Sequence, residues 1–285
     1  MLERFSISAI LGVQVTHNSH LAMSSPTYKF INKLQGKQIL VFGATSGIGF
    51  AVTEACVEHG ANVIITGSKA DKLETTIKRL QTSYGDLQSR VSAHVCDLSN
   101  EETLESNIVA LLDAATDNGR KKINHISFSA GDVFGIPKIS EVEIAQIRRS
   151  DVVRYLAPIM IAKHAGTYVA ASPDSSFTIT GGVNSHKPSP GWSVPAAGGS
   201  RNEGLARGLA VDLAPVRVNL VAPGAIDTEL LRGRVPPPIR DAWVQKSLVK
   251  RLGRPEDTAE AYLYLMKDGF ITGTVVHTNG GALLV

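Results

Sequence analysis

The sequence is poor in cysteine, in long apolar runs and in net charge, and each scarcity excludes a class of protein. Its two cysteines, Cys56 and Cys96, lack the spacing of metal ligands and cannot build a disulfide framework, which indicates a reduced intracellular compartment. The apolar run at 10–15 is too short to cross a membrane, and no other run reaches that length. A net charge of +3 without a long basic run leaves no electrostatic footprint for nucleic acid.

The first 34 residues differ in character from the rest of the chain. Glu3 and the polar residues after the short apolar stretch make this segment a poor secretory signal. We expect a loose tail over 1–34, with a start at Met23 and a packed N-terminal helix as the other interpretations. Residues 35–285 belong to a chain that is 43% hydrophobic, which is enough for one large domain.

From residue 38 onward, short apolar runs alternate with segments of helical length. The runs predicted as strands are 38–43, 61–67, 90–99, 122–131, 175–182, 216–224 and 273–281. The segments predicted as helical are 48–60, 69–85, about 140–171, the second half of 197–214, and 254–268. Ser99 and Glu102 also predict a capping box for a helix after the third strand. The pattern indicates one α/β domain, a Rossmann-type doubly wound parallel sheet with helices on both faces.

The segment GATSGIG at 43–49 follows the first predicted strand and opens a helix. Glycines at such a place permit a tight turn and let backbone N–H groups approach a phosphate at the helix N-terminus. We interpret the segment as a nucleotide-binding loop, with a purely structural turn as the alternative.

The end of the second strand distinguishes NAD from NADP. NAD enzymes place a carboxylate there to bind the ribose 2′-hydroxyl, whereas this chain has Ser68 and Lys69. Because a hydroxyl and an ammonium can receive a 2′-phosphate, NADP is the predicted cofactor. The alternative is that Lys69 is only a solvated residue at a helix start.

Residues 227–252 interrupt the alternation after the sixth strand. Three consecutive prolines at 236–238 suit an exposed segment better than a core helix. We therefore expect a substrate lid over this region.

Several ordered motifs between residue 36 and the C-terminus resemble those of the short-chain dehydrogenase/reductase family. They are GATSGIG, CDLS, FSAG, VRVNLVAPGAIDT, RLGRPED and ITGTVVHTNGG, with FSAG changed at its first two positions. The resemblance implies that Asp97 contacts adenine and that residues after the sixth strand hold the nicotinamide end. The cofactor-binding residues predicted in total are Gly43, Thr45, Ser46, Gly47, Ile48, Gly49, Ser68, Lys69, Asp97, Leu98, Ser129, Ala130, Gly131, Pro223, Gly224, Ile226 and Thr228.

The family's usual catalytic residues are missing. Members that reduce a carbonyl use a tyrosine as proton donor, supported by a lysine, a serine and an asparagine. The register of the helix GLARGLAVDLA places Pro195 at the tyrosine, Gly199 at the lysine, Gly182 at the serine and Arg154 at the asparagine. Proline and glycine have no side-chain proton to give, so an ordinary ketone reduction is disfavoured.

Two routes remain. In the first, an iminium carbon accepts hydride and becomes a neutral amine, which requires orientation and a counter-charge but no proton. Asp132, directly after FSAG, would stabilise the cation, and Arg154 would pair with it or hold a substrate carbonyl. The alternative is a structural ion pair that fills the emptied site. In the second route the protein binds the nucleotide without moving hydride, as a scaffold, a sensor or a cyclase.

The segment NSHKPSPGWSV at 184–194 borders the predicted pocket. His186 is a candidate acid near neutral pH, which keeps a carbonyl reductase as a third hypothesis. Ser189 and Trp192 are assigned to the substrate pocket, Trp192 either as a flat apolar wall or as an anchor of the loop.

The segment KPSPGWSV and Pro195 resemble a fungal subgroup of the family, the bifunctional reductase/Diels–Alderases of prenylated indole alkaloid pathways. This resemblance implies reduction of a cationic iminium-type intermediate with NADPH and then a guided intramolecular cycloaddition. Asp132 and Arg154 are on the expected positions. The subgroup has a second acidic residue near Ser189, and its absence here weakens the cycloaddition part more than the reduction part.

These observations together predict a cytoplasmic NADP-dependent oxidoreductase of secondary metabolism that acts on a small molecule. No metal, membrane or nucleic-acid partner is expected. The long helical regions at 140–171 and 193–213 suit the dimers and tetramers that the family forms, so a homo-oligomer is expected.

Overall fold

The seven apolar runs form the strands of one sheet in the computed structural model, which describes residues 28–87, 89–131 and 138–285. Their order is β3-β2-β1-β4-β5-β6-β7, and all neighbours are parallel, so the predicted doubly wound fold is confirmed. The strand order reverses between β1 and β4, where such folds bind ligands. The strands are β1 Gln38–Phe42, β2 Asn62–Gly67, β3 Val91–Val95, β4 His125–Phe128, β5 Ser176–Thr180, β6 Arg217–Pro223 and β7 Val275–Thr278.

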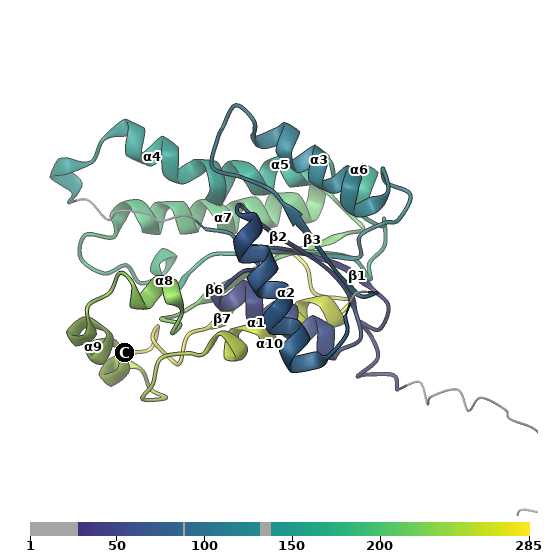
Figure 1. The fold of residues 1–285 in the computed structure, drawn as a ribbon. Coiled ribbons are helices and arrows are strands. Elements are labelled where there is room, and N and C mark those ends of the chain that lie inside the picture. The colour runs from purple at the N-terminus through teal and green to yellow at the C-terminus, as the bar shows by residue number, and fades with distance from the viewer. Residues whose placement is uncertain (1–27, 88, 132–137) are drawn as a thin grey trace, which may run out of the picture.

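Helices connect consecutive strands and cover both faces of the sheet (Figure 1). The α-helices are α1 Gly47–Glu58, α2 Ala70–Tyr84, α3 Leu104–Thr116, α4 Ile144–Asp151, α5 Ala157–Lys163, α6 Ala165–Tyr168, α7 Ser193–Asp212, α8 Glu229–Arg232, α9 Pro237–Lys246 and α10 Pro255–Lys267. A π-helical turn, Val152–Leu156, joins α4 to α5, and short 3₁₀ turns span Ile139–Glu141 and Val183–Ser185.

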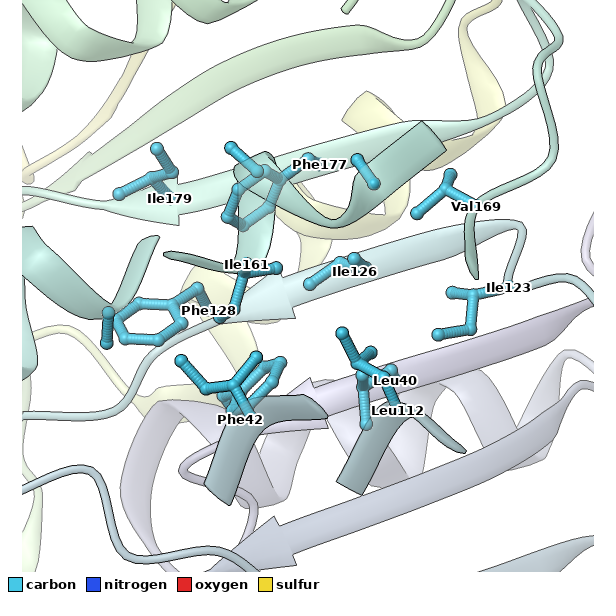
Figure 2. Close-up of a cluster of buried hydrophobic side chains, with 14 of the residues drawn as sticks. Leu40, Phe42, Leu112, Ile123, Ile126, Phe128, Ile161, Val169, Phe177 and Ile179 are labelled. Carbon is cyan, nitrogen blue, oxygen red and sulfur yellow. The ribbon is translucent and has the colours of Figure 1, made fainter. Parts of the chain in front are cut away.

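Strand β1 shows how the sheet divides two cores. Leu40 and Phe42 point to one face, where they join Leu112 of α3 and Ile161 of α5 (Figure 2). Helix α7 adds Ala206 to the same cluster. Ile39 and Val41 point to the other face, among side chains of α1, α2 and α10. This alternation follows from the two-residue period of a strand, and burial on both faces explains why the run is continuously apolar.

The lid predicted at 227–252 contains α8 and α9, which lie with α4 at one end of the molecule (Figure 1). Pro237 and Pro238 are the first residues of α9, where a missing N–H costs nothing because the first turn has no intrahelical acceptor. Helix α9 has no buried residue among those described, in keeping with an exposed segment.

The structure corrects two expectations about helix starts. Helix α7 begins at Ser193, which agrees with the helical region predicted at 193–213 but not with a helix limited to the second half of 197–214, so both Pro195 and Gly199 are helical. Helix α3 begins at Leu104 without a side-chain cap, and the predicted capping box does not form. The Ser99 hydroxyl instead donates to the Asp97 carboxylate at 2.7 Å, because a charged acceptor lies only two residues away.

Contacts of the N-terminal end of the described chain with the rest of the domain begin at Ile31, whose carbonyl lies 3.2 Å from Nδ1 of His59, and continue at Lys33 and Leu34. Leu34 is 1% exposed, and the Lys33 ammonium donates to the carbonyl of Lys267, at the end of α10, at 2.8 Å. Within the described residues, no helix combines the length and the apolar character that crossing a bilayer requires.

Candidate functional site

The glycine-rich loop lies where the strand order reverses. Gly43 has φ of +79°, and a Cβ atom on it would lie 2.7 Å from the backbone nitrogen of Ala130, after β4. A Cβ on Gly49 would lie 2.2 Å from the carbonyl oxygen of Gly43. Only glycine satisfies both approaches, because real Cβ atoms do not come so close to backbone. The structure thereby brings the predicted segments 43–49 and 129–131 together, and the Ser129 hydroxyl donates to the carbonyl of Phe42 at 2.9 Å.

The start of the lid touches the same loop. The backbone N–H of Gly47, the first residue of α1, donates to the Glu229 carboxylate at 3.1 Å. A Cβ on Gly47 would lie 2.9 Å from the Thr228 methyl group, and the Thr228 hydroxyl caps α8 by accepting from the Leu231 N–H at 3.2 Å. A carboxylate seated on this N–H shows that the loop presents a donor to an anion, so it suits a phosphate group.

The residues predicted to contact the adenosine half lie at the carboxyl ends of β2 and β3. Ser68 and Lys69 are exposed, and Lys69 immediately precedes α2. The Asp97 carboxylate accepts from the Ser99 N–H at 2.9 Å and from its hydroxyl, which fixes its direction. Leu98 is 7% exposed and packs in the core.

The residues predicted to hold the nicotinamide end follow β6. Gly224 donates its N–H to the Thr278 carbonyl at 2.9 Å, and a Cβ there would lie 2.9 Å from the Asn279 Cα. Ile226 is 6% exposed and pairs with Gly253 in an isolated parallel bridge. Both ends of this segment are therefore held to the last strand and to the segment before α10.

Helix α7 shows what replaces the tyrosine and the lysine. Pro195 sits in the first turn, where its missing N–H leaves no hydrogen bond unmade. A Cβ on Gly199 would lie 3.2 Å from the Cβ of Ser185, so the serine side chain fills the place where a lysine would begin. The Ser185 hydroxyl donates to the Gly182 carbonyl at 2.9 Å and contacts the Glu203 carboxylate.

Glu203 forms the centre of a polar cluster that the sequence analysis did not include. Its side chain is only 10% exposed, and its carboxylate lies 2.9 Å from Nε2 of His186, the residue considered as a substitute acid. The His186 ring meets the His277 ring edge to face at 4.7 Å between centroids. Burial, reinforced by the positive potential of His186, lowers the pKa of His277. The Nε2 atom of His186 is thus engaged by an internal carboxylate.

Arg154 lies in the π-helical turn and reaches the loop after β4. A Cβ on Gly131 would lie 2.7 to 2.9 Å from the three outer atoms of the Arg154 guanidinium. Arg154 therefore lies beside the last residue of the FSAG segment. Asp132, the residue after Gly131, lies outside the described residues.

The loop before α7 brings Ser189 and Trp192 together, since the Trp192 N–H donates to the Ser189 carbonyl at 3.0 Å. Both residues are partly buried. Asn184 also lies here, and its side-chain nitrogen is 4.0 Å from where a Cβ on Gly182 would be. An amide donor thus stands next to the position that the resemblance gives to the serine, and the sequence reasoning missed it.

Comparison with known proteins assigns the chain to one family. A family profile described as an SDR-like Rossmann domain matches residues 30–285. The short-chain dehydrogenase/reductase malC of Malbranchea aurantiaca is 43% identical over 264 residues, which cover 91% of this chain and 99% of the relative. The short-chain dehydrogenase/reductase fsr5 of Gibberella fujikuroi is 36% identical and covers 90% of this chain and 98% of the relative.

Two solved structures extend the comparison. The MalC reductase/Diels-Alderase of Malbranchea aurantiaca superposes with a TM-score of 0.84 at 43% identity and covers 90% of this chain and 99% of its own. A short-chain dehydrogenase of Burkholderia cenocepacia in complex with NADP superposes with a TM-score of 0.76 at 25% identity, over 88% of this chain and 99% of its own.

Proposed function

The chain belongs to the short-chain dehydrogenase/reductase family of nicotinamide-dependent oxidoreductases, and we propose that it is an NADPH-dependent reductase of cationic, iminium-type substrates from secondary metabolism. One observation carries the proposal. The loop that would cradle the cofactor is complete, while Pro195 and Gly199 stand in the places of the proton-donating tyrosine and its lysine, and the Ser185 side chain packs against Gly199. A site of this kind suits an acceptor that needs no proton.

The chemistry balances without an acid. A bound NADPH would supply hydride, and the addition of hydride to C=N⁺ yields a neutral amine, with the electron pair of the C=N bond moving to nitrogen. The protein must then hold the acceptor in line and offset its positive charge. We assign the counter-charge to Asp132 and the orientation of the substrate to Arg154, which lies against Gly131.

We assign the 2′-phosphate of the cofactor to Ser68 and Lys69. Both are exposed at the carboxyl end of β2, and neither is acidic. The pyrophosphate would lie against the N-terminus of α1, where Gly47 now donates to a carboxylate. The family relative with bound NADP supports the choice of cofactor by analogy.

The name of the MalC relative supports a reductase role for this chain. It also describes a Diels-Alderase, and we extend to this chain only the reduction, because residue 189 is a serine where the subgroup pattern has an acid. Substrates of the indole alkaloid class are the first to test.

We also propose that the protein assembles as a homodimer or homotetramer. Ile144 of α4 is 71% exposed and Val211 of α7 is 77% exposed, on the long helical regions that the family uses for assembly. Size-exclusion chromatography with light scattering measures this directly, and a monomer would contradict it.

The deciding experiment mixes the protein with NADPH and a cyclic iminium probe, a dihydroisoquinolinium salt, and follows the loss of NADPH absorbance. The matched control is a neutral ketone of the same ring system. We expect turnover of the iminium and none of the ketone. Turnover of the ketone that falls as pH rises would favour His186 as an acid, whereas NADPH binding without oxidation of either probe would favour a non-redox scaffold.

The roles of the two charged residues are tested with the same assay. Asp132→Asn keeps the shape of the side chain and removes its charge, and we expect turnover to fall about 10- to 100-fold with little change in NADPH affinity. Undiminished turnover would contradict the role given to Asp132.

A further inference from the structure

Arg154 owes its position to a local irregularity of the helix. It lies in the π-helical turn Val152–Leu156, whose hydrogen bonds close a wider ring than those of an α-helix. The carbonyl oxygen of Arg154 accepts a hydrogen bond at 3.0 Å from the side-chain amide of Asn202, on α7. A π-turn is often found where a helix carries a functional side chain, and here one side chain from another helix binds its backbone.

We propose that Asn202 is a positioning residue: its amide holds the backbone of the π-turn so that the Arg154 guanidinium lies against Gly131. The inference rests on the proposed function, because it gives Asn202 a role in catalysis only through Arg154. Asn202 would touch neither substrate nor cofactor.

Stability does not explain an amide at this position. Asn202 is 6% exposed, and within the described part of the chain its Oδ1 atom is buried without a hydrogen-bond partner. Leaving a polar atom buried and unpaired costs free energy that an apolar side chain would not lose. Among the described residues, the Asn202 side chain makes its hydrogen bond to the carbonyl of Arg154, at the cost of burying a polar amide.

Helix α7 holds the π-turn from both sides of Arg154. The Arg201 guanidinium donates to both oxygens of Asp151, at 2.7 and 2.8 Å, and lies 3.8 Å from the ring centroid of Tyr155. Val152 and Val153 are 4% and 6% exposed and anchor the turn in the core. The hydrogen bond from Asn202 binds the backbone of Arg154, which lies between Val153 and Tyr155 and whose side chain extends to Gly131.

The consequence is geometric. The guanidinium lies within 2.9 Å of the position that a Cβ on Gly131 would take, so it occupies the space of a side chain at that residue. A shift or rotation of the Arg154 backbone is transmitted through its side chain to the site. Misplacement of an orienting group by about 1 Å can cost on the order of 100-fold in rate.

The test replaces Asn202 with leucine, which has a similar volume and lacks both the amide donor and the unpaired oxygen. For Asn202→Leu we expect iminium turnover to fall at least about tenfold. The affinity for NADPH and the melting temperature should be equal to or above those of the wild type. A residue that is merely structural would give the opposite result, with lower melting temperature and normal turnover. Asn202→Asp, which keeps the shape and cannot donate to a carbonyl, provides a second variant if the first does not fold.

A double-mutant cycle with Arg154→Ala shows whether the effect passes through Arg154. We expect the double variant to be no slower than Arg154→Ala alone. Once the arginine side chain is removed, the loss of the Asn202 hydrogen bond has no guanidinium left to misplace. Additive losses would overturn the inference, and so would a full rate for Asn202→Leu beside a slowed Arg154→Ala. A full rate for Arg154→Ala would overturn the proposed role of Arg154 itself.

A crystal structure of Asn202→Leu gives a readout apart from activity. The guanidinium should have moved away from Gly131, and an unmoved guanidinium would overturn the inference.

Discussion

The guanidinium of Arg154 and the backbone of Gly131 are in such close contact that a Cβ atom on Gly131 would lie 2.7 Å from Nη2 of Arg154. The contact joins the helical region after residue 144 to the loop after β4, beside the point where the strand order reverses. It gives a cation to a site that lacks the usual tyrosine and lysine. The glycine is required by the position of the arginine and not by its own backbone, because its φ lies outside the left-handed region.

Gly131→Ala is therefore expected to displace Arg154. All three atoms that the new methyl group would meet belong to the guanidinium, so the side chain moves while the backbone stays. We expect iminium turnover to fall about 10- to 100-fold, with a melting temperature close to that of the wild type. Stopped-flow measurement of NADPH oxidation at saturating cofactor checks the rate.

The matched control is Gly166→Ala, on α6, where an added Cβ would meet nothing within 4 Å. It should leave turnover unchanged. If weaker NADPH binding accounted for the whole loss in Gly131→Ala, the displacement of Arg154 would not be the cause.

The fold could be predicted from the sequence because strands that are buried on both faces of a sheet produce short runs rich in apolar residues. Residues 39–42 of β1 form a continuous apolar run, and β6 is buried at all seven residues although it contains Arg217 and Asn219. The periodic apolar signal of α7 is confined to its second half because Pro195 and Gly199 have low helix propensity, and the packing of Ser185 against Gly199 became visible only in three dimensions. The capping box failed because a local carboxylate competed for Ser99.

The candidate site was predicted only in part, for a related reason. Loop motifs can be identified in a sequence by the spacing of their residues. Asn202 and Glu203 belong to no such motif, and as polar residues in a helix they look like surface residues. One signal was present: with Ala206 they follow the three- and four-residue spacing of a buried helix face. Polar residues on such a face need internal partners, and here those partners, Arg154 and His186, lie far away in the sequence.

Lys69→Glu should reverse the choice of cofactor. An ammonium that pairs with the 2′-phosphate contributes about 1.5 to 3 kcal/mol, so its loss should raise the Kd for NADPH at least about tenfold. Binding of NADH should stay unchanged or improve, because a carboxylate can accept from the ribose hydroxyls. Fluorescence titration with each cofactor measures both constants.

The control for this substitution is Lys72→Glu, which makes the same charge change on an exposed residue one turn into α2. An equal loss of NADPH affinity in both variants would indicate a general charge effect. A wild-type preference for NADH would contradict the assignment of Ser68 and Lys69.

Glu229→Gln should tighten the binding of NADPH. The carboxylate now accepts from the Gly47 N–H at the start of α1 and would repel a pyrophosphate that approaches the same helix end. A charge at a helix terminus is worth about 0.3 to 1 kcal/mol, so we expect the Kd to fall about two- to fivefold. Asp241→Asn, on the exposed helix α9, is the control and should leave the Kd unchanged. Weaker binding in Glu229→Gln would mean that the carboxylate supports the loop in the holoenzyme.

His125 makes the stability of the fold sensitive to acid. Its side chain is buried at 1% exposure in β4, with Nδ1 2.9 Å from the Ser176 hydroxyl. Burial, together with the positive charges of Arg217 and Lys37, lowers the pKa of His125 to about 3. Since the pKa of histidine in an unfolded chain is about 6.5, only the unfolded state binds this proton between those two values. The stabilisation is complete above pH 6.5 and declines as pH falls toward 3.

We therefore expect the free energy of unfolding to decrease with acid by up to about 1.4 kcal/mol per pH unit through this residue alone. Carboxylates titrate in the same range, so the measurement is a comparison of slopes. We would measure urea unfolding at several pH values between 4 and 6.5, within the range set by the His125 pKa. The free energy of unfolding should change less steeply with pH for His125→Asn than for the wild type. Above pH 7 the two slopes should agree, since neither state then carries the extra proton. Equal slopes below pH 6 would show that the buried imidazole is not what makes the folded state acid-labile.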